Sequence, residues 1–525
     1  MAIQASRNLH ADGGFLELRG ILSILSAKAM KNSAIINGIN LKAPAFRPLV
    51  DGSSAFQRAL AYARALPDVA EPVVLLSRAL DLPTGVRAVV RETWTESDVI
   101  SALAAETEGC DSALFFHADC PFLDLPLSLT MLENHRRYWA DYTFADGYPY
   151  GVTPEILTRD AVLRLRALLG NGEAAPGRDM IFAIIRKDIN SFDIETEISP
   201  VDMRLMRLSL TADTERNFLL LSRVVAAGGR EARSACAILR DHQEIHRTLP
   251  AFYPVQIVER CPYACSYCPY PVFAGDVTTR TGFMPVERFR ALVKKIAAFS
   301  GDAVIDISLW GDPGLHPQIV EIAEAALAEP GIELMIETSG VGWQPGTFER
   351  MKAALRRPPT WIVSLDAATE TVYRALRGPG FAEAQKSAEQ LLALFPGRVH
   401  VQAVRMKENE EDLEVFFKSW KSRTENVIVQ KYDSFSRTLP DRQVADLSPL
   451  ARFPCWHLKR DMAILLDGTV PLCREDLHAA TRLGNAFEED LSAIWDKAHD
   501  IHRAHVSGEY PGICAGCDEY YTYNF

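Results

Sequence analysis

The chain has 525 residues, of which 48% are hydrophobic and 24% charged, and its formal net charge is −12. One hydrophobic core rarely serves so many residues, and at roughly 100–200 residues per domain we expect about three domains. The acidic balance argues against a protein that binds nucleic acid through its phosphates, since that contact needs a basic surface. No apolar run approaches the ~20 residues that span a bilayer, and no cleavable signal is evident, so we expect a cytoplasmic protein without a membrane segment.

The first part of the chain alternates between strand-like and helix-like segments. Residues 1–29 mix Gly, Ala, Ser and charged residues without a core pattern, which predicts a tail or extension. From Ser33 the segments SAIING, FQRALAYARAL, VVLLS and ALFFHADCPFL follow one another as in an α/β domain, which we place at 30–225. Residues 226–250 are typical of a polar, helical linker, which the two prolines of TLPAFYP end.

A second alternation begins at Tyr253. Short apolar runs such as AVIDISLW and IELMIET are separated by amphipathic helices such as VERFRALVKKIAAF. Six such units predict a parallel sheet, buried on both faces, in a partial (β/α)6 TIM-type barrel at 251–440. The rhythm then stops, and residues 441–525 indicate a small, loop-rich domain that carries cysteines. The predicted fold class is therefore α/β, with two α/β domains and a small C-terminal domain.

Three cysteines follow the first strand of the predicted barrel, in the segment ERCPYACSYCPYP: Cys261, Cys265 and Cys268. They lie on a loop at the C-terminal end of that strand, where parallel-sheet enzymes build their sites. A chance CxxxCxxC in such a chain has an expectation of order 0.01 or less, so the spacing is a strong signal. Three thiolates that hold a 4Fe-4S cluster leave one iron open for a substrate or cofactor. The alternatives are buried free thiols and a zinc knuckle, for which the loop lacks a fourth Cys or His.

From about Tyr253 to the C-terminus, the chain resembles the radical S-adenosylmethionine (SAM) superfamily. WGDPGLHP resembles its GGEP-type motif, whose backbone and acid receive the amino group of SAM. ETSG stands where many relatives carry a TNG-like strand end. SLDA, followed by YRALRG, is similar to the SLDA…YRxxRG segment of relatives. Singly, these segments also suit ordinary turns, strand ends or solvated helix faces. The resemblance implies that the loop cysteines are catalytic and that SAM is contacted by Tyr267, Gly311, Asp312, Pro313, Ser339, Ser364, Asp366, Arg374 and Arg377.

A second group of cysteines lies near the C-terminus: Cys455, Cys473, Cys514 and Cys517. Four thiols can close a zinc ribbon or a second iron–sulfur cluster, and composition does not choose between them. DGTVPLCRED, LGN and LSAIW resemble the SPASM auxiliary-cluster domain, whose full form carries more cysteines. The resemblance implies one auxiliary 4Fe-4S cluster held by these four thiolates. Three histidines nearby are alternative ligands, although such side chains are more often packed or solvated: His457, His502 and His505.

The front segments resemble nucleotide-sugar cytidylyltransferases and related glycosyltransferase-like folds. In that family an Asp-x-Pro element and a late carboxylate hold metal and nucleotide, which implies such roles for Asp119 and Asp213. The glycine-rich loop that neutralises the triphosphate survives only in part, at Asn37, Gly38, Lys42 and Arg47. We therefore expect a domain that recognises substrate or is an architectural remnant, rather than an active transferase.

The resemblance as a whole implies an enzyme that reductively cleaves SAM to a 5′-deoxyadenosyl radical, which abstracts hydrogen from an unreactive C–H position. A flavodoxin- or ferredoxin-type protein would supply the electron. SPASM relatives often act on peptides or proteins, which favours a peptide substrate. The front half instead favours a nucleotide-linked sugar or similar metabolite. A non-catalytic iron–sulfur electron carrier or scaffold is the remaining alternative.

Overall fold

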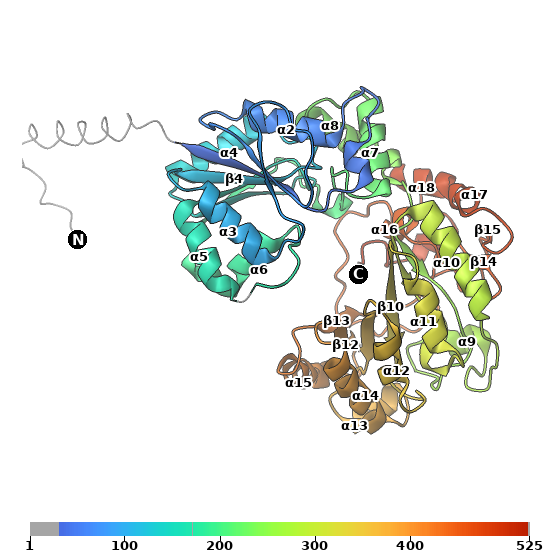
Figure 1. The fold of residues 1–525 in the computed structure, drawn as a ribbon. Helices are drawn as coiled ribbons and strands as arrows, with labels where there is room; N and C mark the ends of the chain where they lie inside the picture. The colour runs from blue at the N-terminus through green and yellow to red at the C-terminus, as the bar shows by residue number, and fades with distance from the viewer. Residues whose placement is uncertain (1–30, 171, 523–525) are drawn as a thin grey trace, which may run out of the picture. The chain divides into compact units, whose positions relative to one another are not determined.

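The computed structural model of the chain describes residues 31–170 and 172–522, so the predicted tail at 1–29 lies outside the described residues. The chain forms two compact units (Figure 1). The front unit extends to Asp213 and includes Val224–Ile238, whereas the barrel unit comprises Thr214–Arg223 and the chain from Leu239 onward. Among the described residues, no helix has the length and apolar character needed to cross a membrane.

The front unit is built on a seven-stranded sheet with the order β3-β2-β1-β4-β6-β5-β7. The first four strands in this order run parallel, and β6 runs antiparallel to both of its neighbours. The strands are β1 (Asn32–Gly38), β2 (Val73–Leu76), β3 (Arg87–Val90), β4 (Ser112–His117), β5 (Tyr142–Asp146), β6 (Glu155–Thr158) and β7 (Ile194–Ile198).

Helices cover both faces of this sheet. Ile36 of β1 packs in one core with helices α2 and α4, and Ile35 packs in the other with α3, α5 and α6. Neighbouring strand residues point to opposite faces, so a continuously apolar strand requires a helix layer on each side. The helices of this region are α2 (Ala55–Ala65), α3 (Glu96–Glu106), α4 (Leu125–Arg137), α5 (Arg159–Leu169), α6 (Met180–Ile185), α7 (Glu215–Ala226) and α8 (Ala232–Asp241). The predicted α/β fold of the front half is confirmed.

The barrel unit holds a parallel six-stranded sheet with the order β13-β12-β11-β10-β9-β8. Each strand is followed by helical or loop segments that return the chain to the same end of the sheet, which confirms the predicted partial (β/α)6 barrel (Figure 1). The strands are β8 (Phe252–Pro254), β9 (Ala303–Asp306), β10 (Ile332–Thr338), β11 (Thr360–Ser364), β12 (Val399–Arg405) and β13 (Val427–Lys431). The helices are α9 (Tyr270–Ala274), α10 (Val286–Ser300), α11 (Ile319–Leu327), α12 (Thr347–Ala354), α13 (Glu370–Leu376), α14 (Phe381–Leu394) and α15 (Glu410–Lys421).

The C-terminal segment covers the edge of the barrel sheet at β8. The N–H of Met462 donates to the carbonyl of Phe252 (3.0 Å), and the N–H of Ile464 donates to that of Pro254 (2.8 Å). An edge strand left bare would expose unpaired backbone groups, so this segment completes the sheet and anchors the second cysteine group beside it. Its elements are α16 (Trp456–Arg460), β14 (Thr469–Val470), β15 (Gly484–Asn485), α17 (Leu491–Asp496) and α18 (His499–Val506).

Candidate functional site

The three cysteines of the CxxxCxxC loop lie between β8 and α9. Backbone hydrogen bonds fold this loop: the N–H of Cys261 donates to the carbonyl of Val277, and that of Cys268 to the carbonyl of Cys265, each at 3.1 Å. Burial raises the pKa of all three thiols, and each thiol lies within electrostatic range of another. Partly buried thiols grouped in this way fit a cationic metal cluster, because bound iron stabilises the thiolates that burial disfavours.

The loop that contains the GDP sequence, residues 310–315, packs directly against the chain before Cys261. A Cβ at Gly311 would lie 2.1 Å from the carbonyl oxygen of Val258, so a larger residue does not fit. The N–H of Asp312 donates to the carbonyl of Arg260 at 2.9 Å. These two close approaches place the predicted SAM-binding loop beside the cysteine loop.

Trp310 stands where relatives of the GGEP type carry glycine. Its φ of 49° lies in the left-handed region, which costs a non-glycine residue of order 1 kcal/mol. The indole stacks on Tyr270, with ring centroids 6.1 Å apart, and packs edge-on against Phe273 at 5.4 Å. These aromatic contacts help to offset the backbone strain and link the Trp310 loop to α9, which follows the cysteine loop.

Asp312 joins this loop to the end of β10. Its carboxylate, buried with only 3% of the residue exposed, accepts hydrogen bonds from the N–H of Gly314 (3.0 Å) and the hydroxyl of Thr338 (2.9 Å). It also accepts from the N–H and the hydroxyl of Ser339, at 2.9 and 2.6 Å. Both oxygens are therefore engaged by the protein, and the carboxylate links the short helix that begins at Pro313 to Ser339, a predicted SAM contact.

Asp366, Tyr267 and Arg377 form a buried group beside the cysteine loop. Arg377 donates to the Asp366 carboxylate and, at 2.9 Å, to the Tyr267 hydroxyl, which itself donates to Asp366. Asp366 has a φ of 64° and accepts the backbone N–H of Val404 at 2.7 Å. The Arg377 charge opposes the rise that burial causes in the pKa of the Cys265 thiol. The structure thus brings three of the predicted cofactor contacts together next to a cluster cysteine.

Arg374 lies elsewhere. The side chain of Thr369 caps α13, whose last turn carries Arg374, and the chain leaves the helix at Arg377. The Arg374 side chain is 67% exposed and pairs with Glu370 at 3.3 Å, one turn earlier on the same helix. Of the two predicted arginines, only Arg377 therefore lies against the cysteine loop.

Polar side chains line the inside of the barrel near Cys268. Glu337 accepts hydrogen bonds from the hydroxyl of Ser364 (2.7 Å) and the amide of Gln402 (3.0 Å), and its charge acts on the Cys268 thiol. Asp306 accepts the N–H of Ser308 at 3.0 Å and lies within electrostatic range of Glu337. Burial raises the pKa of Asp306 to about 7 and also raises that of Glu337.

Sequence reasoning missed Asp306, Glu337 and Gln402 as site residues. A signal was present, because each is a polar residue next to buried apolar residues in a strand of the parallel barrel sheet. Such a residue costs free energy unless it is hydrogen-bonded or functional. A polar residue in several successive buried strands therefore indicates a polar barrel interior.

The raised pKa of Asp306 predicts a pH-dependent gain from the Asp306→Asn substitution. In the unfolded chain the carboxyl ionises near 3.8, but in the folded protein only near 7, so ionisation weakens the fold as pH rises through this window. Asparagine does not ionise. Thermal unfolding should show equal stability at pH 3.5 and a greater Tm for Asp306→Asn above pH 7. The exposed Asp276, whose pKa is lowered by its hydrogen bonds with Thr278, provides the control Asp276→Asn, which should show no such gain. A pH-independent Tm difference for Asp306→Asn would contradict the assignment.

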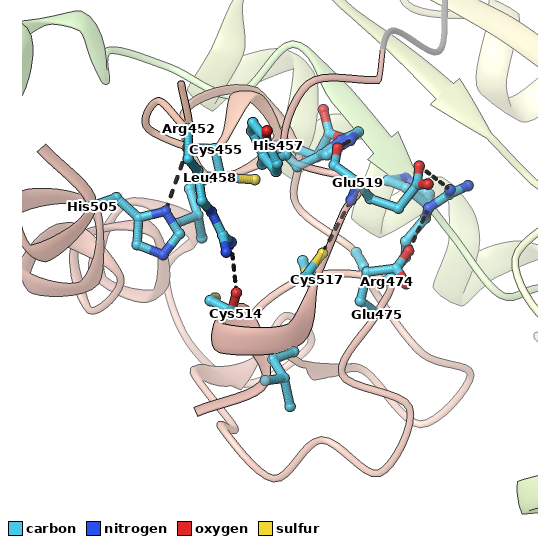
Figure 2. Close-up of a pocket in the computed structure, with 16 residues that line it drawn as sticks. Arg452, Cys455, His457, Leu458, Arg474, Glu475, His505, Cys514, Cys517 and Glu519 are labelled. Atoms are coloured by element: carbon cyan, nitrogen blue, oxygen red, sulfur yellow. Dashed lines mark hydrogen bonds and ion pairs between the residues drawn. The ribbon is translucent and has the colours of Figure 1, made fainter. Parts of the chain in front are cut away.

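The second group of cysteines surrounds a cavity of about 540 Å³ in the C-terminal segment. Figure 2 shows Cys455, Cys514 and Cys517 around this cavity, and Cys473 also lines it. Burial raises the pKa of all four thiols. Four thiols that line one cavity fit a fully ligated metal cluster.

Two of the three histidines line the same cavity but make other contacts. His457 is held between the Asp461 carboxylate (2.6 Å) and the carbonyl of Glu519 (3.0 Å), and His505 accepts the backbone N–H of Cys455 at 3.4 Å (Figure 2). His502 is buried on α18 and is not among the residues that line the cavity. The histidines therefore support the cysteine loops, and the four thiols remain the predicted ligand set.

Arg474 follows Cys473 directly and was not predicted from the sequence. It pairs with Asp433 and Glu475 at 3.1 Å each and lies 3.6 Å from Glu519. Its charge also acts on Asp306 inside the barrel. Asp433, Asp518 and Glu519 lie close enough to hold a cation. Lys431 and Arg474 already pair with them, which indicates an ion-pair cluster.

The two carboxylates predicted in the front half, Asp119 and Asp213, line one cavity of the front unit together with Asn37 and Lys42. Arg178, which sequence reasoning missed, lies between them. Arg47 is not among the residues that line this cavity.

The sequence matches known families in the regions that carry these sites. The model of the radical SAM superfamily matches residues 255–419, which include the cysteine loop and the strand ends described above. The chain belongs to the radical SAM superfamily. The model of SPASM, an iron–sulfur cluster-binding domain, matches residues 455–518, which contain all four cysteines of the second group. This radical SAM enzyme therefore uses SAM and a 4Fe-4S cluster, and its SPASM domain holds auxiliary iron–sulfur.

Similar proteins are found in several bacteria. An uncharacterised protein of Treponema pallidum is 42% identical over 358 residues, which cover 66% of this chain and 98% of that protein. Streptococcus suis SuiB, bound to its precursor peptide SuiA, is 15% identical, with 63% of this chain and 80% of that chain covered and a TM-score of 0.40. A cytidylyltransferase of Leptospira borgpetersenii is also 15% identical, with 41% and 96% covered and a TM-score of 0.35.

The contacts of Asp312 predict that Asp312→Asn weakens SAM binding in this radical SAM enzyme. Asparagine keeps one acceptor oxygen, so part of the hydrogen bonding to Thr338 and Ser339 is lost. Because each bond to a charged group is worth about 1.5–3 kcal/mol, we expect SAM to bind with a Kd roughly 10- to 100-fold weaker. Equilibrium dialysis with labelled SAM measures this. The control Asp302→Asn breaks an ion pair with Arg216 and should bind SAM normally. An unchanged Kd for Asp312→Asn would refute the role.

Proposed function

We propose that this radical SAM enzyme modifies a peptide or protein at an unreactive C–H position. When bound and reduced, the cluster and SAM supply the radical that removes the hydrogen. Cys261, Cys265 and Cys268 hold the cluster. Gly311, Asp312, Pro313 and Ser339 shape one side of the SAM site, and Tyr267, Ser364, Asp366 and Arg377 the other, where the Arg377 guanidinium suits a carboxylate.

The observation that carries the peptide proposal is the pair of carboxylic acids inside the barrel. Asp306 and Glu337 lie close enough for each charge to act on the other. Arg474, the nearby cation, is already paired with Asp433 and Glu475. Such an interior gives a diphosphate little positive charge to bind, which disfavours a nucleotide-linked sugar. It provides acceptors for N–H groups, which an amide backbone or an amine supplies.

Two features of the chain's own side chains support a shielded reaction. Trp310 and Phe273 pack edge-on against each other on segments that adjoin the cysteine loop, and such aromatic surface would help to keep water from the site. Asp306, largely protonated below about pH 7, can donate or accept a proton at its free oxygen during turnover. An electron donor of the flavodoxin or ferredoxin type completes the proposal.

The test uses anaerobically reconstituted, dithionite-reduced protein incubated with SAM. We expect 5′-deoxyadenosine, and we expect its formation to rise with a peptide whose gene neighbours this one, but not with nucleotide-linked sugars. Deuterium at the reacting carbon should appear in the 5′-deoxyadenosine. Acceleration by a nucleotide-linked sugar alone would favour metabolite modification, and no SAM cleavage with intact clusters would favour an electron carrier or scaffold.

A further inference from the structure

The front unit contains a cavity at the carboxyl edge of its sheet. Strand β1 lies between β2 and β4, and the chain passes from β1 to one side and later to the other, so the strand order reverses between β1 and β4. A parallel sheet leaves a crevice at such a switch point, where ligands bind. A cavity of about 640 Å³ occurs at this place, lined by Asn37 and Asn40 after β1 and by His117 and Asp119 at the end of β4.

Arg178 joins the two carboxylates of this cavity. Its Nη1 donates to Asp119 at 3.2 Å, its Nη2 contacts the other oxygen of the same carboxylate, and its Nε lies 3.4 Å from Asp213. Burial disfavours the guanidinium charge, but the neighbouring Asp119 raises the pKa of Arg178 above its ordinary value. The three residues thus form a partly buried group in which one guanidinium contacts two carboxylates, and its disruption would leave both carboxylates without this counter-charge.

This arrangement places a permanent cation where two carboxylates would otherwise bind a divalent metal ion. A metal would have to displace Arg178 from a bidentate contact, which is geometrically specific and costly to break. Counting Asp119, Asp213, Arg178 and Lys42 as ionised gives the lining no net charge. A metal-bound polyphosphate is therefore poorly matched to this cavity.

Uncharged polar groups make up much of the remaining lining. Burial lowers the pKa of His117 to about 4, so the ring is neutral, and its Nε2 is buried with no hydrogen-bond partner in the part of the chain that the structure describes. Asn37 and Asn40 add amides. The side chain of Asp213, which is 26% exposed and accepts a hydrogen bond from the Thr211 hydroxyl at 2.6 Å, adds a carboxylate, the group that pairs with vicinal hydroxyls of ribose. We propose that this cavity binds an uncharged ligand with vicinal hydroxyls, a free sugar or the ribose of a nucleoside, without a divalent metal ion.

The metal part of the proposal is tested by equilibrium dialysis of Mn²⁺ against the full-length, cluster-loaded protein. Arg178→Ala should gain one bound Mn²⁺ relative to wild type, because it frees both carboxylates. Arg91→Ala, which removes an exposed ion pair with Asp98 in the same unit, should gain none. If Arg178→Ala unfolds, Arg178→Gln, which keeps more of the side-chain volume, replaces it in the same measurement. Wild-type Mn²⁺ binding that Asp119→Asn removes would overturn the proposal.

The ligand part is tested by saturation-transfer NMR and calorimetry with cytidine, uridine, their 2′-deoxy analogues and free hexoses, each with and without Mg²⁺. We expect binding that does not need Mg²⁺, and Asp213→Asn should weaken it about tenfold or more, as expected for loss of a charged hydrogen-bond acceptor. Loss with the 2′-deoxy analogues identifies a ribose, whereas binding of a hexose alone identifies a sugar. Binding only of Mg²⁺–CTP, or of no diol in the set, would refute the proposal. SAM cleavage without substrate should be the same in Asp213→Asn as in wild type, which separates this site from the barrel function.

Discussion

Alanine at Cys261, Cys265 or Cys268 is expected to abolish the conversion of SAM to 5′-deoxyadenosine. Each substitution removes one of three thiolates from a loop in which no other cysteine is present to replace it. The loss should exceed about a thousandfold, since without the cluster the reductive step has no electron source, and each factor of ten corresponds to 1.36 kcal/mol of barrier. Liquid chromatography of anaerobic reactions measures the product.

Iron content decides whether this loss has the proposed cause. A protein with two 4Fe-4S clusters holds roughly eight irons, and each loop variant should keep roughly four in the C-terminal cluster. Cys110→Ala is the matched control, because Cys110 lies in the front unit outside both cysteine groups, and it should keep full iron and activity. SAM cleavage that persists in all three loop variants would contradict the radical mechanism at this loop.

Substitution of an auxiliary cysteine should separate SAM cleavage from product formation. In Cys455→Ala or Cys514→Ala the three-cysteine loop is unchanged, so some 5′-deoxyadenosine should still form, whereas modified substrate should fall below detection. The physical reason is that a fully ligated cluster beside the barrel acts in electron transfer or supports the fold, and not in binding SAM. The ratio of 5′-deoxyadenosine to modified substrate is the quantity to measure.

Loss of the auxiliary cluster also threatens folding, because the four thiols that line the cavity of the C-terminal segment would lose the group that holds them together. Cys514→Ser keeps nearly the same volume and distinguishes the two effects: the variant should remain folded by circular dichroism, lose roughly four irons and form no product. Normal product formation after the loss of those irons would show that the second cluster is not needed for turnover. One zinc in place of four irons would refute the auxiliary assignment.

The sequence motif that contains Asp312 does not reveal which residues hydrogen-bond to its carboxylate. Its place in the GDP sequence predicts a direct contact with the amino group of SAM, and that role stays a prediction. Tertiary contact adds that Thr338 and Ser339, more than twenty residues away, already donate to both carboxylate oxygens. A carboxylate that accepts these hydrogen bonds holds the neighbouring strand end in place, and it therefore positions the site whether or not it also contacts the ligand.

Much of this protein is determined by local sequence. Alternating apolar runs and amphipathic helices specify βα units, because side chains repeat every two residues in a strand and every 3.6 in a helix. The spacing of Cys261, Cys265 and Cys268 likewise specifies a metal-binding loop, since ligands so close in the chain need no distant partner. The CxxC pair at Cys514 and Cys517 predicts metal ligands for the same reason.

Only the tertiary structure decided which distant groups meet. It placed Arg377, and not Arg374, against the cysteine loop, a choice set by where α13 ends. It brought Asp119 and Asp213 together and set Arg178 between them, although these residues are far apart in the chain. Such contacts depend on the packing of whole elements, so no local period or spacing encodes them, and they determine whether a pair of carboxylates binds a metal ion or an arginine.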